Sequence, residues 1–294
     1  MREQFKEYKP RAKTMVVIDQ ANRIIDEYVG QGFKLTLRQL YYQFVARGLL
    51  EENTMKQYKR IGTITRDARD GGMIDWDAIE DRTREVHTHS SWINPAAMIT
   101  SAAMSYRIDL WENQVYRPEV WVEKDALLGV IEGVCTELRV PYFAHRGNNS
   151  QTLQYEAGRR FEDYIDQGLV PVVLHLADHD PNGIDMTRDN RDRIALYARG
   201  DVEVRRVGLN IDQVRRFGPP PNFAKDSDTR SAAYIEQFGE ECWELDALSP
   251  TVIADLIREA IEPLIDWPKW QASTAREERG RKQLVSVAKN WAIG

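Results

Sequence analysis

Three carboxylates stand where two predicted strands end. Glu123 closes the segment EVWVE, and Asp178 and Asp180 follow the apolar segment PVVLHLA. Residues i and i+2 of an extended segment point the same way, so both aspartates can face one point that Glu123 reaches from a neighbouring strand. Three converging carboxylates repel each other unless a cation lies among them. Because the set offers oxygen ligands without a nearby His or Cys pair, it favours Mg²⁺ or Mn²⁺ over zinc.

The two aspartates also have a simpler interpretation. They belong to the segment DHDPNG, and Asp, Pro, Asn and Gly are the usual turn formers. A plain turn is therefore the alternative to a metal site. The placement of both acidic segments at predicted strand ends favours the metal site.

The chain around these acids alternates between strand and helix patterns. Strands are predicted at 119–123, 141–145, 171–177 and 202–209, and helices at 126–138, 150–168 and from about 185. This alternation predicts an α/β fold with a parallel sheet covered by helices. Ligands of such sheets bind at the carboxyl ends of the strands, which is where the three acids stand.

The first 95 residues have a different pattern. Apolar positions recur at helical spacing over 14–30, Thr36 caps a second helix, and a third helix covers 55–69. Three helices followed by the extended segment MIDW predict a small helix-turn-helix or winged-helix domain over residues 1–95. The predicted organisation continues with a connector over 96–117, the α/β domain over 118–250 and a helical extension over 251–294.

The composition is that of an ordinary soluble globular protein. The chain has 294 residues, 42% of them apolar, and its net charge of −6 excludes a uniformly basic coat for nucleic acid. The charge is uneven, because residues 1–95 carry a net charge of +2 and the remainder −8, which indicates two regions with different roles. Two cysteines without CxxC spacing predict neither a disulfide framework nor a zinc site. We see no leader and no bilayer-length apolar run, so a cytoplasmic protein is expected.

Two segments carry a family resemblance. WVEKDAL and LADHDPNGID resemble the signature segments of a Toprim domain, with the best match to the A subunit of topoisomerase VI, a type IIB topoisomerase, and its meiotic double-strand-break relative. In that family the Glu and both Asp bind Mg²⁺, a role that the resemblance assigns to Glu123, Asp178 and Asp180. WELDAL, residues 243–248, resembles a further element near the end of that domain. The resemblance implies a winged-helix (CAP-like) domain followed by a Toprim domain, as in compact stand-alone "mini-A" members.

A tyrosine pair extends the resemblance. In the family, an Arg and two intervening residues precede an aromatic residue and the nucleophilic tyrosine, and Arg38, Tyr41 and Tyr42 stand in those places. The resemblance thus makes Tyr42 the nucleophile. A phenol with a pKa near 10 needs help to attack a phosphodiester, and Arg38 lies one helical turn before Tyr42, where its guanidinium could stabilise a phenolate and hold phosphate. The alternative is that Tyr42 is a half-buried packing residue.

Basic residues supply candidate DNA contacts. Lys56, Lys59 and Arg60 lie on the predicted helix at 55–69, where they could contact phosphates or form an ordinary solvated face. Lys124 follows Glu123 and could approach phosphate or be a solvated charge. The sequence departs from the family in its shorter length, in Gln39 where an acidic residue is common, and in His179 between the aspartates.

The expected function is Mg²⁺-dependent cleavage of double-stranded DNA by tyrosine transesterification. The resemblance implies a homodimer, because in the family the tyrosine of one protomer meets the Toprim site of the other. This chain carries no ATPase signature, so ATP-driven strand passage would need a separate B-type ATPase subunit. The resemblance also implies association with the nucleoid in a prokaryotic or viral context. Two alternatives stay open: a Toprim nuclease that uses activated water and leaves Tyr42 structural, and a non-catalytic DNA-binding partner.

Overall fold

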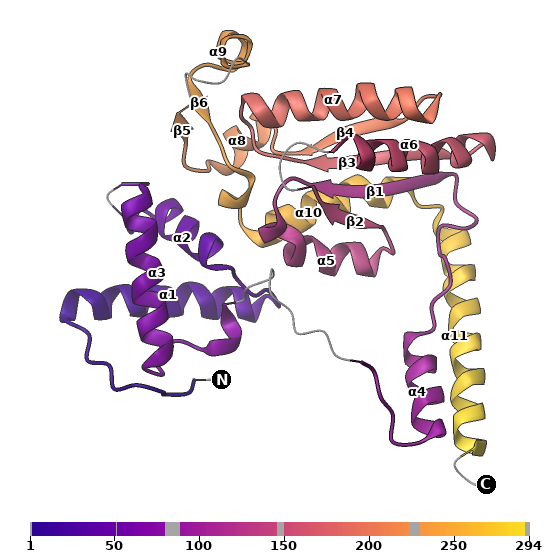
Figure 1. The fold of residues 1–294 in the computed structure, drawn as a ribbon, viewed down its shortest axis with the longest axis horizontal. Coiled ribbons are helices and arrows are strands. Elements are labelled where there is room, and N and C mark those ends of the chain that lie inside the picture. The colour runs from indigo at the N-terminus through magenta and orange to yellow at the C-terminus, as the bar shows by residue number, and fades with distance from the viewer. Residues whose placement is uncertain (1, 51, 80–88, 146–149, 224–229, 292–294) are drawn as a thin grey trace.

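The structure is a computed structural model that describes residues 2–50, 52–79, 89–145, 150–223 and 230–291. Within these residues the fold is mixed α/β and contains a four-stranded parallel sheet. Figure 1 shows the sheet in the upper half, the N-terminal helices at the lower left, and a pair of helices that descends at the lower right.

The parallel sheet confirms the predicted α/β class. Its strands are β1 (Tyr116–Val122), β2 (Tyr142–Ala144), β3 (Val170–Leu176) and β4 (Glu203–Gly208). They pair in the order β2-β1-β3-β4, all parallel. Val122, the last residue of β1, pairs with Leu176 and with Ala144, so three strands end at one edge. The predicted acids stand at this edge.

Helices cover both faces of the sheet. They are α6 (Gln151–Asp166) and α7 (Pro181–Ala198) on one face, and α5 (Leu128–Glu137) and α10 (Pro250–Ile261) on the other. Trp121 and Val173 pack toward α6 and α7, whereas Val120, Val122 and Leu174 pack toward α5 and α10. Side chains of a strand alternate between the two faces, so a strand covered on both sides reads as a continuous apolar run.

A short excursion leaves the sheet after β4 and returns to its carboxyl edge. It consists of α8 (Ile211–Phe217), β5 (Asn222–Phe223), α9 (Ser231–Phe238), β6 (Glu241–Cys242) and the 3₁₀ turn η3 (Leu245–Ala247). β5 and β6 pair antiparallel. Immediately after β6, Trp243 exchanges two backbone hydrogen bonds with His179, at 2.8 and 2.9 Å. This bridge holds the WELDAL segment against the DHDPNG segment.

The N-terminal unit is helical, as predicted. It comprises α1 (Ala12–Gly30), α2 (Leu37–Ala46), α3 (Met55–Asp70) and the 3₁₀ turn η1 (Trp76–Ala78), around its own apolar core. Gln39, which departs from the family pattern, closes a capping box with Thr36, whose backbone N–H donates to Gln39 Oε1 at 2.9 Å. The segment MIDW is not extended throughout, because Asp75 caps the η1 turn by accepting from the Asp77 N–H at 2.8 Å. Within the described residues no two-stranded wing follows α3.

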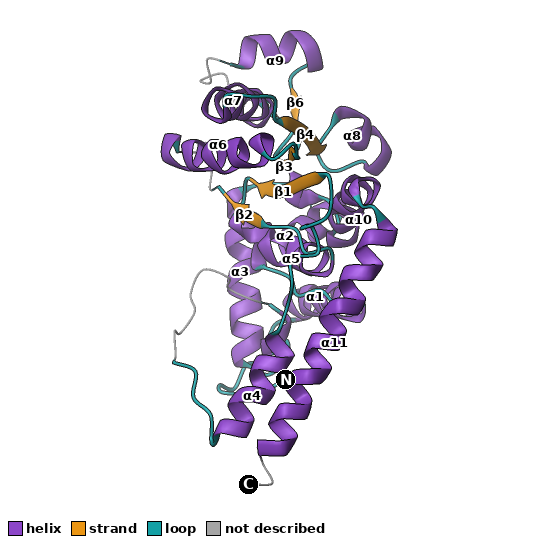
Figure 2. Cartoon of the chain, turned by 90° about the vertical axis from the view of Figure 1, so that its right-hand side faces the viewer, coloured by secondary structure: helices purple, strands orange, loops and turns teal. Residues whose placement is uncertain are grey.

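The predicted connector contains a helix. α4 (Pro95–Ser105) begins after Asn94, which accepts a hydrogen bond from the Ala97 N–H at 2.8 Å, and packs along α11 (Trp267–Trp291), as Figure 2 shows. α4 has no charged residue and no polar face, so its sequence gave no amphipathic signal. Likewise, α10 was predicted as part of an extension, but its buried face belongs to the core beneath the sheet.

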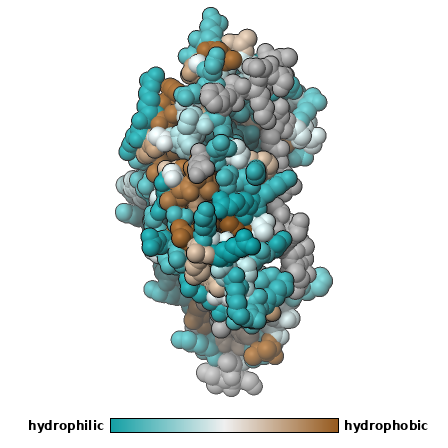
Figure 3. Space-filling model, turned by 90° about the vertical axis from the view of Figure 1, so that its left-hand side faces the viewer, coloured by the Kyte–Doolittle hydropathy of each residue, from teal (hydrophilic) through white to brown (hydrophobic). Residues whose placement is uncertain are grey.

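The exposed surface is mostly polar, as expected for a chain in which 29% of the residues are charged. The face shown in Figure 3 is largely hydrophilic, with apolar side chains in limited patches. Among the described residues, no helix combines the length and the apolar character needed to cross a membrane.

Candidate functional site

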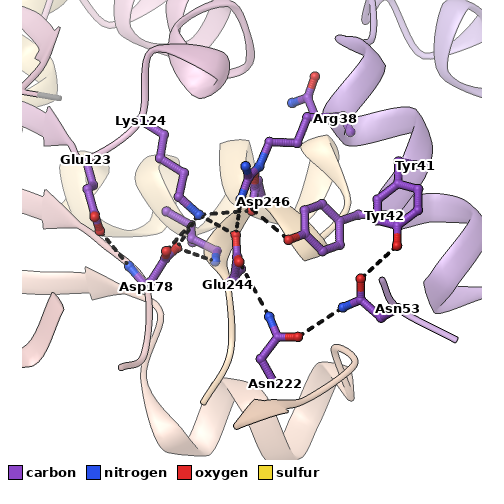
Figure 4. A network of polar contacts seen from close by, with 12 residues as sticks. Arg38, Tyr41, Tyr42, Asn53, Glu123, Lys124, Asp178, Asn222, Glu244 and Asp246 are labelled. Carbon is purple, nitrogen blue, oxygen red and sulfur yellow. Dashed lines mark hydrogen bonds and ion pairs between the residues drawn. The ribbon is translucent and has the colours of Figure 1, made fainter. Parts of the chain in front are cut away.

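The candidate site lies at the carboxyl edge of the sheet, where β1, β3 and the WELDAL segment meet. Asp178 follows β3, and its carboxylate accepts a hydrogen bond from the Leu245 N–H at 2.9 Å. Together with the bridge between His179 and Trp243, this contact brings Glu244 and Asp246 to face Asp178 (Figure 4). Two segments that are far apart in sequence thus form one site.

Three acidic side chains converge there. Oxygen atoms of Asp178, Glu244 and Asp246 all lie within 4.8 Å of one another, and Asp178 and Asp246 are buried. Within the described part of the chain, this acidic cluster is the one group of three potential ligands with that spacing. The cluster could hold a metal ion.

The predicted ligands are divided by the structure. Asp178 belongs to the acidic cluster, and Glu123 is beside it, where its carboxylate accepts a 3.3 Å hydrogen bond from the Asp178 N–H. Asp180 caps α7, because its carboxylate accepts from the Gly183 N–H at 2.6 Å. DPNG is therefore the start of a helix, with Pro181 at its first position, and not a plain turn.

The sequence patterns did not predict the two acids of the WELDAL segment as candidate ligands. The signal that could have found them was the resemblance of that segment to a family element, which drew attention to the segment but not to Glu244 and Asp246. Gly183 explains another part of the motif. A Cβ at this position would lie 2.1 Å from the Asp178 carbonyl oxygen, so only glycine lets α7 start this close to the acidic cluster.

Lys124 lies among the three carboxylates. Its Nζ is 2.7 Å from Asp178, 2.8 Å from Glu244 and 3.2 Å from Asp246. Burial by itself would lower the pKa of the Lys124 ammonium, but the surrounding carboxylates, Asp178 foremost, raise it above its ordinary value. Lys124 is therefore a largely buried part of the site, whereas the predicted DNA-binding cations of α3 are exposed.

Arg38 reaches the acidic cluster from α2. Its Nε donates to Asp246 at 2.7 Å, across 208 positions of sequence, and its Nη2 pairs with Glu244. The pKa of Glu244 is lowered to about 2, because Lys124 and Arg38 outweigh the effect of its burial. Arg38 thus connects the N-terminal helices directly to the acidic cluster.

Tyr42 lies beside Arg38, on the same face of α2, as its spacing predicted. Arg38 Nη2 is 3.5 Å from the Tyr42 hydroxyl, and the guanidinium carbon is 5.5 Å from the ring centroid. Burial, followed by the charges of Glu244 and Asp246, raises the pKa of Tyr42 above its ordinary value. The phenol therefore keeps its proton at neutral pH in this arrangement.

The side chains of the site carry a net negative charge, which favours the binding of a cation. Its five carboxylates are Glu123, Asp178, Asp180, Glu244 and Asp246, and its three cations are Lys124, Arg38 and the buried Arg206. Fully ionised, these side chains carry a net charge of −2. Burial raises the pKa of Asp178 to about 7 despite the opposing effect of Lys124, and burial also raises the pKa of Glu123. A divalent cation with a preference for oxygen ligands fits this donor set and this charge.

A pocket of about 330 Å³ opens between the N-terminal helices and the segment around β5 and β6. Arg38, Tyr42 and Glu244 line one end of the pocket. Tyr42 is only 7% exposed, but its presence in the pocket lining places it within reach of a small group that enters there.

The α3 cations lie on the surface. Lys56, Lys59 and Arg60 are exposed on the first turns of α3, close to the pocket residues Met55 and Tyr58 in sequence. Arg60 donates to Gln57 at 3.2 Å, whereas Lys56 and Lys59 form no ion pair with any residue in the described ranges. This surface is available for a polyanion.

Comparisons with known proteins identify no relative. The sequence matches no protein-family model, and no curated protein matches it significantly. The resemblance of its motif segments to topoisomerase VI A subunits therefore supports a proposal and does not establish a family.

Proposed function

We propose that this chain binds double-stranded DNA and cleaves its backbone by Mg²⁺-dependent tyrosine transesterification, in the manner of type IIB topoisomerase A subunits. One observation carries the proposal: Arg38 contacts both the Tyr42 hydroxyl and the carboxylates of the acidic cluster. A candidate nucleophile, a phosphate-binding guanidinium and a candidate cation site therefore lie together. The winged-helix and Toprim arrangement implied by the motif segments is part of the same proposal.

The chemistry follows from the roles of these residues. The Tyr42 oxygen attacks a backbone phosphorus, one ester P–O bond of the strand breaks, and a phosphotyrosyl bond forms. The phenol proton must leave, and it passes to water that enters the pocket, because Glu244, with its pKa lowered to about 2, is a weak base. Arg38 can bind the phosphate in two-point fashion while the leaving oxygen of the strand takes up a proton.

The acidic cluster would hold the cation, with Glu123 and Asp180 nearby. When bound, Mg²⁺ (or Mn²⁺) would supply positive charge that polarises the phosphate and offsets the charge that develops in the transition state. Lys124 now lies among the same carboxylates, so it must shift when a cation binds there. A shifted ammonium can then contact the DNA backbone, which gives Lys124 the phosphate role that its position in the sequence suggested.

The partners are also proposals. Lys56, Lys59 and Arg60 would bind DNA phosphates, and a separate B-type ATPase subunit would drive any strand passage. The family precedent implies a homodimer in which the tyrosine acts on the partner's site, whereas the contact described above forms within one chain. Mixing Tyr42→Phe protein with Asp178→Asn protein distinguishes the two, because cleavage recovers only if the two sites combine across protomers.

A second candidate is a metal-dependent nuclease that uses activated water. It is favoured by the burial and the raised pKa of Tyr42, which oppose its action as a nucleophile. The third candidate, a non-catalytic DNA-binding partner, does not account for the three carboxylates that converge in the acidic cluster, with Glu123 beside them.

The decisive experiment is incubation of end-labelled DNA with the protein and Mg²⁺, followed by a denaturing gel. Transesterification leaves DNA covalently attached to protein, and hydrolysis leaves free cut ends. Binding without any cut DNA would support the non-catalytic alternative.

A further inference from the structure

The end of the pocket away from the acidic cluster has its own chemistry. Tyr41, Tyr58, Asn53 and Asn222 line it. Ring centroids of Tyr41 and Tyr58 are 5.3 Å apart with an interplanar angle of 84°. Arg38 and Glu244 are the charged residues of the pocket lining, and the remaining lining side chains are uncharged.

Two amide groups connect this end to the acidic cluster (Figure 4). The Tyr41 hydroxyl donates to Asn53 Oδ1 at 2.9 Å, and Asn53 Nδ2 donates to Asn222 Oδ1 at 3.0 Å. Asn222 Nδ2 then donates to Glu244 at 3.4 Å. Each Asn amide has two N–H groups, and within the described residues only one of each is used, so both amides keep a donor for a ligand.

This lining selects a flat, uncharged, hydrogen-bonding group. A phosphate would prefer cations, which are at the other end, and an aliphatic group would leave the amides unpaired. A nucleobase satisfies both requirements, because it presents donors and acceptors on its edge and a π-face to aromatic rings. The pocket size, near the lower limit of roughly 300 Å³ for small-molecule sites, suits one nucleotide and not a stacked pair.

We infer that the pocket binds a single nucleobase next to the phosphate held by Arg38 and Tyr42. A base can enter only after it has left the helical stack, so the preferred substrate has an unpaired nucleotide at the site of attack. This inference rests on the proposed action on DNA and specifies which DNA is preferred. Asn53 and Asn222 are its specificity residues, and Tyr58 offers the aromatic contact.

The test compares three labelled duplexes by fluorescence anisotropy without divalent cation, so that no DNA is cut. One is fully paired, one carries a single bulged nucleotide, and one carries the same bulge without its base. The wild-type protein should bind the bulged duplex about tenfold more tightly than the other two, the effect of stacking one base. Equal affinity for the bulge with and without its base would overturn the inference, since backbone flexibility alone would then explain any preference.

Two variants distinguish recognition of the base from binding of the backbone. Asn53 is exposed, so Asn53→Ala should fold normally, bind the paired duplex as the wild type does, and lose the preference for the bulged base. Lys59→Ala, on the outer face of α3, should weaken binding of all three duplexes by the same factor. A protein that binds none of the duplexes would overturn the proposed function as well, whereas tight binding without base preference would overturn the pocket assignment alone.

Discussion

The Arg38 guanidinium donates to the Asp246 carboxylate at 2.7 Å, and this contact joins α2 to the turn that follows β6. The Asp246 side chain is fully buried, whereas 44% of the Arg38 side chain is exposed. A buried carboxylate depends on its partners, so the loss of Arg38 leaves Lys124 as the main cation against Asp246. The same contact therefore bears on stability, on cation binding and on the position of Tyr42.

The substitution Arg38→Ala should have different effects on stability, on cation binding and on DNA cleavage. We expect it to lower the free energy of unfolding by about 1–3 kcal/mol, because a buried acceptor loses a charged donor. It should also tighten Mg²⁺ binding, because one competing positive charge is removed, while covalent DNA adduct is lost. Arg38→Lys should restore most of the stability but little adduct, since an ammonium cannot bind in two-point fashion. Denaturant titration, calorimetry and a denaturing gel measure the three quantities, and unchanged Mg²⁺ affinity would argue against competition between Arg38 and the cation.

Tyr42→Phe should abolish the covalent adduct while the free energy of unfolding changes by less than about 1 kcal/mol, because the ring stays in place and its hydroxyl forms only a weak 3.5 Å contact. Tyr41→Phe is the matched control. It removes a hydroxyl that bonds Asn53 and the Thr54 carbonyl, so it should affect stability more and the adduct less. DNA cutting that persists in Tyr42→Phe, with no adduct in the wild type, would support the nuclease.

Substitutions of single acids should identify the cation ligands. Asp178→Asn should weaken Mg²⁺ binding at least tenfold, because Asp178 belongs to both candidate ligand sets. Asp180→Asn should keep the fold, since Asn caps helices as well as Asp does. The two candidate sets are the acidic cluster and the predicted set of Glu123, Asp178 and Asp180. Calorimetric Mg²⁺ titration of Glu244→Gln and Asp180→Asn shows which set binds the cation. A large loss in Glu244→Gln favours the acidic cluster, and a large loss in Asp180→Asn favours the set predicted from sequence.

Mg²⁺ binding should depend on pH near neutrality. The pKa of Asp178 is about 7 in the fold, so this carboxyl is partly protonated at pH 7 and Mg²⁺ must displace that proton. Affinity should fall by up to about tenfold per pH unit below 7. Because the folded pKa lies above the unfolded value, protonation of Asp178 stabilises the apo fold at low pH, and this stabilisation disappears as pH rises through 7. Calorimetry in two buffers of different ionisation enthalpy measures the released proton, and Asp178→Asn should release none.

The double substitution Lys59→Ala with Arg60→Ala should weaken DNA binding with little change in sequence preference, because phosphate contacts position and do not specify. The slope of log affinity against log salt should decrease in magnitude by about 0.9 for each lost contact on duplex DNA. Lys282→Ala is the control, because its exposed side chain lies on α11, in another part of the fold. An unchanged slope in the double variant would show that this face of α3 does not contact the backbone.

Local patterns in the chain were sufficient to predict much of the scaffold. The apolar runs of β1 and β3 and the helical spacing around α1 to α3 are properties of neighbouring residues, so they could be identified before any contact was known. The shared face of Arg38 and Tyr42 follows from the helical repeat in the same way. α4 escaped prediction because its helix depends on packing against α11 and not on a pattern of its own.

The composition of the site depends on contacts between distant segments. Glu244 and Asp246 reach Asp178 because Trp243 pairs with His179, and Lys124 faces these acids because β1 and β3 end side by side. No spacing in the chain encodes such distances, which arise when separately formed elements bury their apolar faces against one another. The sequence therefore revealed Asp178, Arg38 and Tyr42 as residues that could do chemistry. The packing of the sheet, the β5–β6 excursion and α2 determined which residues meet and brought Glu244 and Asp246 to them.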